Sequence, residues 1–206
     1  MKVFLVVLNT LADWEIGYIT AELHSKRMFA DPAADFALVK VGLSDQEIVT
    51  MGGMRIKPDI ALDALRMGPD DLLLMPGGET WQRPETAPMA RYAREQLDQG
   101  KRVAAICGAT AALAGAGALD ERPHTSNARE FLAMSCPAYA GGPHYREQAA
   151  VRDGNLITAS GLAPLEFAYE VFKLLNVFRP ATLEAWFKLY QTREPKYFHA
   201  LMASME

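Results

Sequence analysis

The sequence predicts an α/β fold, in which helices cover both faces of a mostly parallel central sheet to form a three-layer α/β/α sandwich. Short runs rich in β-branched residues alternate with longer segments of helical period, which is typical of a parallel sheet. The runs at 2–8 and 71–75 are almost wholly apolar, as strands buried on two faces must be. No linker, repeat or low-complexity segment interrupts the 206 residues, so we predict one domain over residues 1–206.

The first half of the chain is expected to alternate strands with helices. Ile16, Ile19 and Leu23 lie three and four positions apart and predict a helix after the first strand. Gly52-Gly53 separates two extended segments, which predicts a small hairpin. Gly100 follows a helical segment as a natural C-terminal cap. The expected strands cover 2–8, 36–41 and 71–75, the hairpin 48–51 with 54–56, and the helices 13–28, 59–66 and 88–99.

The second half is expected to continue this alternation and to end in helices. A strand leads directly into a helix of small residues, and Ser126 or Asn127 is expected to cap the helix that follows. Asp153-Gly154-Asn155 predicts a tight turn between two strands. The expected strands cover 101–106, 148–152 and 156–159, and the helices 110–117, 127–134, 163–177, 181–189 and a last segment after Pro195.

Composition and charge exclude several classes of protein. The chain carries 21 Lys and Arg against 25 Asp and Glu, with no basic stripe, so we expect no nucleic-acid partner. Two cysteines cannot form a disulfide framework. The apolar run Val3–Leu8 is shorter than the core of a signal peptide, and no stretch approaches the ~18 apolar residues of a membrane span. We therefore expect a cytoplasmic protein with free thiols and no membrane partner.

Cys107 lies at the sharpest local feature, the run AAICGATAA at 104–112. An apolar strand ends there in a nucleophilic side chain, and a helix of small residues begins at once. This pattern is typical of a nucleophile elbow, a strained strand-to-helix turn that needs small neighbours such as Ala105 and Gly108. The helix N-terminus also favours the thiolate over a free thiol, whose pKa is ~8.5. The alternative is a buried structural cysteine in a β–α turn. Cys136, in a loop-like stretch without such neighbours, is interpreted as structural.

A cysteine nucleophile needs a base within hydrogen-bond reach, and four histidines are available. His124 follows the elbow helix, and the return connection brings it to the sheet edge where Cys107 lies. His144, in GGPHY, is a second loop candidate. His24 and His199 fall in helical segments and are interpreted as surface or packing residues. No histidine has a metal-ligand spacing to a cysteine or carboxylate, so we predict no metal.

Two further segments follow buried strands and would meet Cys107 at the same sheet edge. Glu15 begins the first helix, where it is either a functional acid or simply a favourable first-turn acid. Gly77 and Gly78, in MPGG, can present backbone N–H groups to an oxyanion together with the amide of Gly108, or they form an ordinary turn. No Gly-Lys-Ser/Thr follows them, so this is not a phosphate loop.

Taken in order, these segments resemble the ThiJ/PfpI superfamily, whose fold is that of the class I glutamine amidotransferases. The matching features are a first strand leading to Glu15, then LLLMPGG, AAICGA, PHTSN and GNLITASGLAPLEFA, almost the length of the chain. The likeness is greatest to small bacterial members described as amidotransferase-like or as intracellular protease/amidase. The resemblance implies a flavodoxin-like central sheet.

The resemblance also implies roles for particular residues. Cys107 would be the elbow nucleophile, Glu15 the acid that hydrogen-bonds its thiolate, and His124 the dyad histidine. The oxyanion site would be lined by three glycines, Gly77, Gly78 and Gly108.

The chain departs from two branches of this superfamily. In the PfpI protease branch a histidine follows the cysteine, but here Gly108 does. True glutamine amidotransferases carry a late His-Pro-Glu-like triad, whereas the comparable stretch Ala163–Glu166 has no histidine. Glutamine hydrolysis by that triad is therefore not expected.

Two functional hypotheses follow. The first is a cysteine-dependent hydrolase or lyase acting on a small carbonyl or amide substrate, as an amidase or peptidase or as a glyoxalase III-type enzyme that converts methylglyoxal to lactate. The second is a redox sensor or stress-protective chaperone whose Cys107 is oxidised without turnover. Neither needs a cofactor. A regulatory ligand-binding domain is disfavoured because only about 29 residues follow Val177, too few for a DNA-binding module.

The resemblance implies a homodimer. The aromatic residues of the tail either cover such an interface or cover the sheet; they are Trp186, Phe187, Tyr190, Tyr197 and Phe198.

Overall fold

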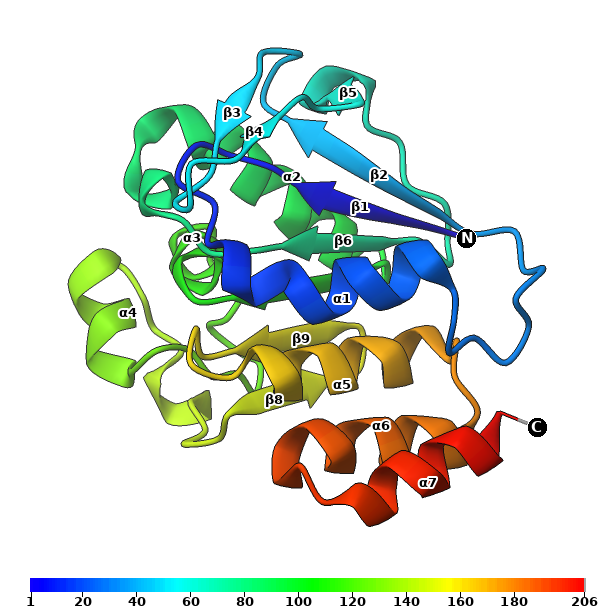
Figure 1. Cartoon of the computed structure of the whole chain (residues 1–206). Coiled ribbons are helices and arrows are strands. Elements are labelled where there is room, and N and C mark those ends of the chain that lie inside the picture. Colours follow the sequence, from blue (N-terminus) through cyan, green and yellow to red (C-terminus); the bar gives the residue numbers. More distant parts are fainter. Residues whose placement is uncertain (206) are drawn as a thin grey trace.

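Figure 1 shows the computed structural model of the chain, which describes residues 1–205. Within these residues the central sheet has seven strands in the order β5-β2-β1-β6-β7-β9-β8. Neighbouring strands are parallel except β8 and β9, which form an antiparallel pair. The predicted mostly parallel sheet is thereby confirmed. Its strands are β1 (Lys2–Val6), β2 (Ala37–Gly42), β5 (Ile60–Ala61), β6 (Leu72–Met75), β7 (Arg102–Ile106), β8 (Ala150–Asp153) and β9 (Leu156–Ala159).

Helices cover both faces of the sheet, so the three-layer architecture is also confirmed (Figure 1). One apolar strand shows how the sequence fills both cores. In β1, Val3 and Leu5 join the core under α1, α5 and α6, whereas Phe4 and Val6 join the core under α2 and α3. The helices are α1 (Asp13–Ser25), α2 (Ala87–Asp98), α3 (Gly108–Gly115), α4 (Arg129–Ser135), α5 (Pro164–Leu175), α6 (Pro180–Thr192) and α7 (Pro195–Ser204).

The predicted hairpin is present, but the helix expected at 59–66 is not. Strands β3 (Ile48–Val49) and β4 (Arg55–Ile56) pair antiparallel. At 60–64 the chain instead adds the edge strand β5 to β2 and then makes a single 3₁₀ turn. Asp59 explains the difference, because its carboxylate accepts the backbone N–H of Lys40 at 2.8 Å and pairs with the Lys40 ammonium. These contacts draw the segment onto the sheet edge.

Helix α4 also begins later than predicted. Its N-cap is Ala128, without a side-chain hydrogen bond to the first turn. The hydroxyl of Ser126 is instead 2.6 Å from that of Thr110. The Asn127 side chain is likewise used elsewhere, at the carboxyl edge of the sheet.

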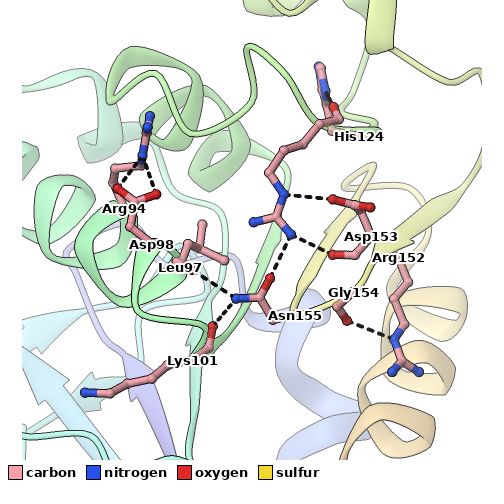
Figure 2. Close-up of polar contacts among 10 residues, drawn as sticks. Arg94, Leu97, Asp98, Lys101, His124, Arg152, Asp153, Gly154 and Asn155 are labelled. Atoms are coloured by element: carbon pink, nitrogen blue, oxygen red, sulfur yellow. Dashed lines mark hydrogen bonds and ion pairs between the residues drawn. The ribbon is translucent and has the colours of Figure 1, made fainter.

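A polar cluster ties together the opposite end of the sheet (Figure 2). Arg122 donates to the carboxylate of Asp153 at 2.8 Å and to the side-chain oxygen of Asn155 at 2.7 Å. Asn155 in turn donates to the backbone oxygen of Lys101, just before β7. The predicted turn between β8 and β9 is therefore anchored to the start of β7. The same cluster fixes the segment that carries His124, two residues after Arg122.

Helix α6 packs against α5, and α7 packs against α6 (Figure 1). Trp186 of α6 is fully buried, and its indole donates to Glu22 of α1 at 3.0 Å. Glu22 is 1% exposed and also pairs with Arg27. Of the tail aromatics, Trp186 thus belongs to the core, whereas Phe198 on α7 is half-exposed. No helix among residues 1–205 is both long enough and apolar enough to cross a bilayer.

Candidate active site

Cys107 occupies a strained turn between β7 and α3. Its φ is 58° and its ψ is −125°, a backbone conformation that non-glycine residues rarely adopt. The turn is held from both sides, because the Cys107 N–H donates to Ala159 of β9 at 3.0 Å and its carbonyl accepts the N–H of Thr110 at 3.0 Å. The structure thus contains the sharp strand-to-helix turn that the sequence predicted.

Glu15 reaches the same place from the first turn of α1. The residue is 1% exposed, and its Oε2 accepts the backbone N–H of Gly77 at 2.5 Å. The other oxygen, Oε1, is buried and has no hydrogen-bond partner among the described residues. It lies against the thiol: a methyl group placed on Gly161 would sit 2.8 Å from Cys107 Sγ and 3.0 Å from Glu15 Oε1. A buried carboxylic acid and a buried thiol therefore share one small space.

Glycines line this space because nothing larger fits. A Cβ on Gly77 would lie 2.7 Å from Glu15 Oε2 and 2.8 Å from Cys107 Cβ. A Cβ on Gly108 would lie 2.9 Å from the carbonyl oxygen of Gly78. Gly161, which follows β9, is equally confined, and the sequence had not singled it out.

The oxyanion site needs a correction. The Gly77 amide, expected to face a substrate oxyanion, already donates to Glu15, so its place in the structure is to hold the acid. The Gly108 amide interacts with the Cys107 sulfur. Gly78 lies where the segment after β6 bridges to Leu11. An oxyanion role for Gly78 and Gly108 stays a prediction.

His124 also needs a correction, because the structure does not pair it with Cys107. The side chain is fully buried, with Nδ1 2.7 Å from the carbonyl oxygen of Arg122 and Nε2 2.6 Å from the Tyr139 hydroxyl. A carbonyl only accepts, so Nδ1 carries the proton and Nε2 accepts from Tyr139. Burial lowers the pKa of His124, which also favours this neutral form. Both nitrogens are therefore occupied.

The second loop candidate, His144, is half-buried in a 3₁₀ turn, and its carbonyl accepts the N–H of His124. Among residues 1–205, the side chain of His144 makes no hydrogen bond to Cys107.

Asn127 is the side chain that does reach the thiol. Its Nδ2 donates to Cys107 Sγ at 3.3 Å, and its Oδ1 accepts the N–H of Gly161 at 2.8 Å. The carbonyl of Gly161 accepts the indole N–H of Trp14 at 3.1 Å. The sequence placed Asn127 in the PHTSN stretch but interpreted it as a helix cap. Its place after the elbow helix, on the segment returning to the carboxyl edge, was the signal for a site residue.

Burial governs the charge states of both reactive groups. It raises the pKa of Glu15 above its usual range, more than the Gly77 hydrogen bond lowers it. Burial raises the pKa of Cys107 to about 11; the Asn127 hydrogen bond lowers it, and the negative charge of Glu15 raises it. The favourable helix N-terminus expected from sequence is thus outweighed by desolvation. At neutral pH the two groups together retain at least one proton.

The other cysteine lies apart from this site. Cys136 is half-buried, and its Sγ donates to the carbonyl of Ala111 at 3.1 Å. Burial raises its pKa as well. Among residues 1–205, no group of three or more His, Cys, Asp and Glu side chains is arranged to hold a metal ion.

Most of the chain has a counterpart among known families. The sequence profile of the DJ-1/PfpI family matches residues 1–174. This chain belongs to the DJ-1/PfpI family. The ThiJ/PfpI resemblance deduced from sequence is confirmed. The match ends in α5, so α6 and α7 lie beyond the part that the family profile describes.

Several relatives share nearly the whole chain. The uncharacterized protease YoaZ of Bacillus subtilis is 49% identical over 201 residues, which cover 98% of this chain and 96% of the relative. The crystal structure of a ThiJ/PfpI family protein from Bacillus anthracis, also 49% identical, covers 98% of this chain and 96% of its own, with a TM-score of 0.95. The DJ-1 superfamily protein Atu0886 of Agrobacterium tumefaciens is 33% identical, covers 94% of this chain and 98% of its own, and has a TM-score of 0.80.

Proposed function

We propose that this DJ-1/PfpI protein is a cysteine-dependent hydrolase or lyase that acts on a small carbonyl or amide substrate, with Cys107 as its nucleophile. The observation that carries the proposal is the buried Oε1 of Glu15, which lies against the thiol without another partner. An ionised oxygen in that position would lose the hydrogen bonds of water and gain only the weak S–H donor of Cys107. A protonated carboxyl avoids this cost, because Oε1–H then donates to the sulfur. In the resting site the Cys107 thiol, whose pKa burial raises to about 11, holds the proton, and transfer of that proton to Glu15 produces the attacking thiolate.

For an amide the chemistry runs through a thioester. The thiolate adds to the carbonyl carbon, and the π electrons move onto oxygen, which faces the amides of Gly78 and Gly108. As the C–N bond breaks, the leaving nitrogen takes the proton of Glu15. Water then adds to the thioester, gives a proton back to Glu15, and the C–S bond breaks to release the acid and the thiolate.

For an α-oxoaldehyde the same two groups suffice. The thiolate adds to the aldehyde, and the new alkoxide takes the proton of Glu15. The resulting carboxylate removes the proton on the former aldehyde carbon, and the π electrons of the neighbouring carbonyl move onto its oxygen, which gives an enediolate. Glu15 returns the proton to the neighbouring carbon, and the hydroxyl proton of the former aldehyde carbon passes to the neighbouring oxygen, which leaves a 2-hydroxy thioester. Water hydrolyses that thioester. The aldehyde carbon is oxidised and its neighbour reduced, so no redox cofactor enters the balance.

The names of the relatives favour an amide substrate. Two differences between this chain and known branches of the superfamily narrow the kind of amide reaction that we propose. The Bacillus subtilis relative is named a protease, although an uncharacterized one. Gly108 follows the cysteine where the PfpI protease branch has histidine, and Ala163–Glu166 holds no late histidine, so the proposal does not include a glutamine amidotransferase. We place the activity in the cytoplasm, where both cysteines stay reduced.

A second candidate is a redox sensor. The half-buried Cys107 sulfur already faces the Asn127 side-chain amide and the Gly108 N–H, donors that would also hold the oxygens of a sulfinate. Mild peroxide followed by peptide mass spectrometry separates the candidates. Selective oxidation of Cys107 over Cys136 in a protein that turns nothing over would favour the sensor.

The test of the first candidate is turnover of methylglyoxal and of chromogenic amides by the wild-type chain beside Cys107→Ala. We expect Cys107→Ala to abolish the activity and Cys136→Ala to keep it. Full activity of Cys107→Ala would overturn the proposal.

A further inference from the structure

Asn127 is an exposed residue whose side chain is nevertheless held at both ends. Exposed amides on a protein surface usually bond to water and move between rotamers. Here one end contacts the sulfur of Cys107 at 3.3 Å, and the other contacts the backbone of Gly161 at 2.8 Å. The Asn127 side chain packs no core and caps no helix, so its contacts concern the site.

The orientation of the Asn127 amide follows from its partner. The Gly161 N–H can only donate, so the atom facing it is the carbonyl oxygen Oδ1. The amide nitrogen must then face Cys107. Asn127 therefore presents an N–H donor to the sulfur, and it does so whichever proton state the thiol adopts.

Gly161 is itself held on both sides. Its carbonyl accepts the indole N–H of Trp14, whose ring is 52% exposed at the start of α1. Its Cα packs so closely that a methyl group there would sit 2.8 Å from Cys107 Sγ. A continuous row of hydrogen bonds thus runs from Trp14 through Gly161 and Asn127 to the thiol.

We propose that Asn127 is a catalytic residue, whose side-chain N–H stabilises the Cys107 thiolate in place of the histidine, and that Trp14 is a positioning residue that acts through Gly161. The inference rests on the proposed function in taking Cys107 as the reacting group. Glu15 gives up its proton during the reaction, so it cannot also stabilise the sulfur throughout. Asn127 does not titrate, and it keeps one donor on the sulfur at every stage.

The test measures thiolate formation without a substrate. Wild type and variants are alkylated with iodoacetamide across a pH series, and peptide mass spectrometry follows Cys107 and Cys136 separately. The midpoint of the rate profile reports the ionisation of Cys107, because a change in access alters the plateau and not the midpoint. Cys136 serves as an internal control in every sample.

Two substitutions at position 127 separate the donor from the shape. Asn127→Leu keeps the size and removes both polar atoms, whereas Asn127→Asp keeps the acceptor for Gly161 and replaces the donor by a negative charge. We expect the midpoint to rise by about one unit in Asn127→Leu, which is about tenfold less thiolate at neutral pH, and further in Asn127→Asp. A wild-type midpoint in Asn127→Leu would overturn the proposal.

Trp14→Phe tests the positioning role, because it keeps the ring and removes the N–H. We expect a smaller shift of the midpoint in the same direction; an unchanged midpoint would refute the part assigned to Trp14. Leu162→Ala is the matched control, since Leu162 follows Gly161, is 95% exposed and offers no side-chain donor. Its midpoint should equal that of wild type.

The outcome is separable from that of the proposed function. If Cys107→Ala retains full turnover while Asn127→Leu shifts the midpoint, the enzyme proposal fails and the contact with the thiolate stands. If Asn127→Asp loses turnover with an unshifted midpoint, Asn127 contacts the substrate instead, and the inference drawn here is wrong.

Discussion

Glu15 carries a carboxyl group into surroundings that disfavour its charge, and this determines how the site behaves with pH. Its folded-state pKa is raised above the ordinary 4.5 by burial. Between 4.5 and the raised value, the folded protein binds more protons than the unfolded chain. The free energy of unfolding therefore falls as pH rises through that range.

Glu15→Gln should exchange activity for stability. The neutral amide still accepts from Gly77 and has no charge to desolvate, so we expect a higher free energy of unfolding than wild type at pH 7 and an equal one below pH ~4.5. Turnover should fall about 10²-fold or more, because the amide cannot transfer a proton. Urea titrations at a series of pH values check the first expectation. A variant less stable than wild type at neutral pH would contradict the assigned environment of Glu15.

Gly161→Ala should damage the site through volume alone. The new methyl group would lie 2.8 Å from the sulfur and 2.9 Å from the Cβ of Cys107, neither of which can easily move from the strained turn. We expect a loss of roughly 1–3 kcal/mol of stability and a loss of Cys107 alkylation. Gly17→Ala is the control: no atom lies within 4 Å of its Cβ position, and within α1 it should gain about 0.5–1 kcal/mol. Equal changes in melting temperature for Gly161→Ala and Gly17→Ala would refute the close packing of Gly161 against Cys107.

At the scale of elements, α1 supplies the acid and is held in place by the tail. Trp186 of α6 and Arg27 both bond to the buried carboxylate of Glu22, seven residues after Glu15 on the same helix. The tail that lies beyond the family profile therefore supports the helix that positions the site. These hydrogen bonds couple the tail to α1 more strongly than apolar packing alone, because removing them would leave the carboxylate of Glu22 buried without partners and would destabilise the fold.

Trp186→Phe tests that link. It keeps most of the buried ring and removes the N–H, which leaves Glu22 with Arg27 alone. We expect a loss of about 1.5–3 kcal/mol in chemical denaturation, the usual contribution of a hydrogen bond to a charged group. Trp14→Phe, at a half-exposed indole, should cost clearly less. Similar losses in the two variants would show that the contact with Glu22 is not what stabilises α1.

Strands and helices were the most predictable elements, and the reasons are local. An apolar run such as Leu72–Met75 can only be buried on two faces, and a cysteine followed by Gly108-Ala109 fits a sharp turn into a helix. The segment at 59–66 was misjudged, because pairing with β2 and a carboxylate contact to Lys40 outweigh its helical pattern. Such pairing is not visible in a short stretch of sequence.

At the scale of the whole molecule, the site combines residues that sequence patterns do not connect. Glu15, Cys107 and Gly161 come together only because β1, β7 and β9 end at one edge of the sheet. Cys107 and Glu15 could be predicted from their position after these strands. Asn127 could not, because an asparagine before a helix has a local explanation and its partner Gly161 lies 34 residues away.

His124 was assigned to the wrong neighbours for a similar reason. Its burial depends on Tyr139 and Tyr145, whose edges pack against the ring from a later loop. A histidine on the segment returning to the active edge carries no local sign that it turns inward. The homodimer implied by the family stays a prediction.

The most direct measurement is the location of the covalent intermediate. The wild-type chain, Cys107→Ala and Cys136→Ala are mixed with an activated acyl ester, quenched in acid within the first turnover and mapped by peptide mass spectrometry. We predict the acyl mass on the peptide of Cys107 in the wild type and in Cys136→Ala, and no acyl-enzyme in Cys107→Ala. Turnover without a label on Cys107, or an equal burst from Cys107→Ala, would contradict a nucleophilic cysteine at the end of β7.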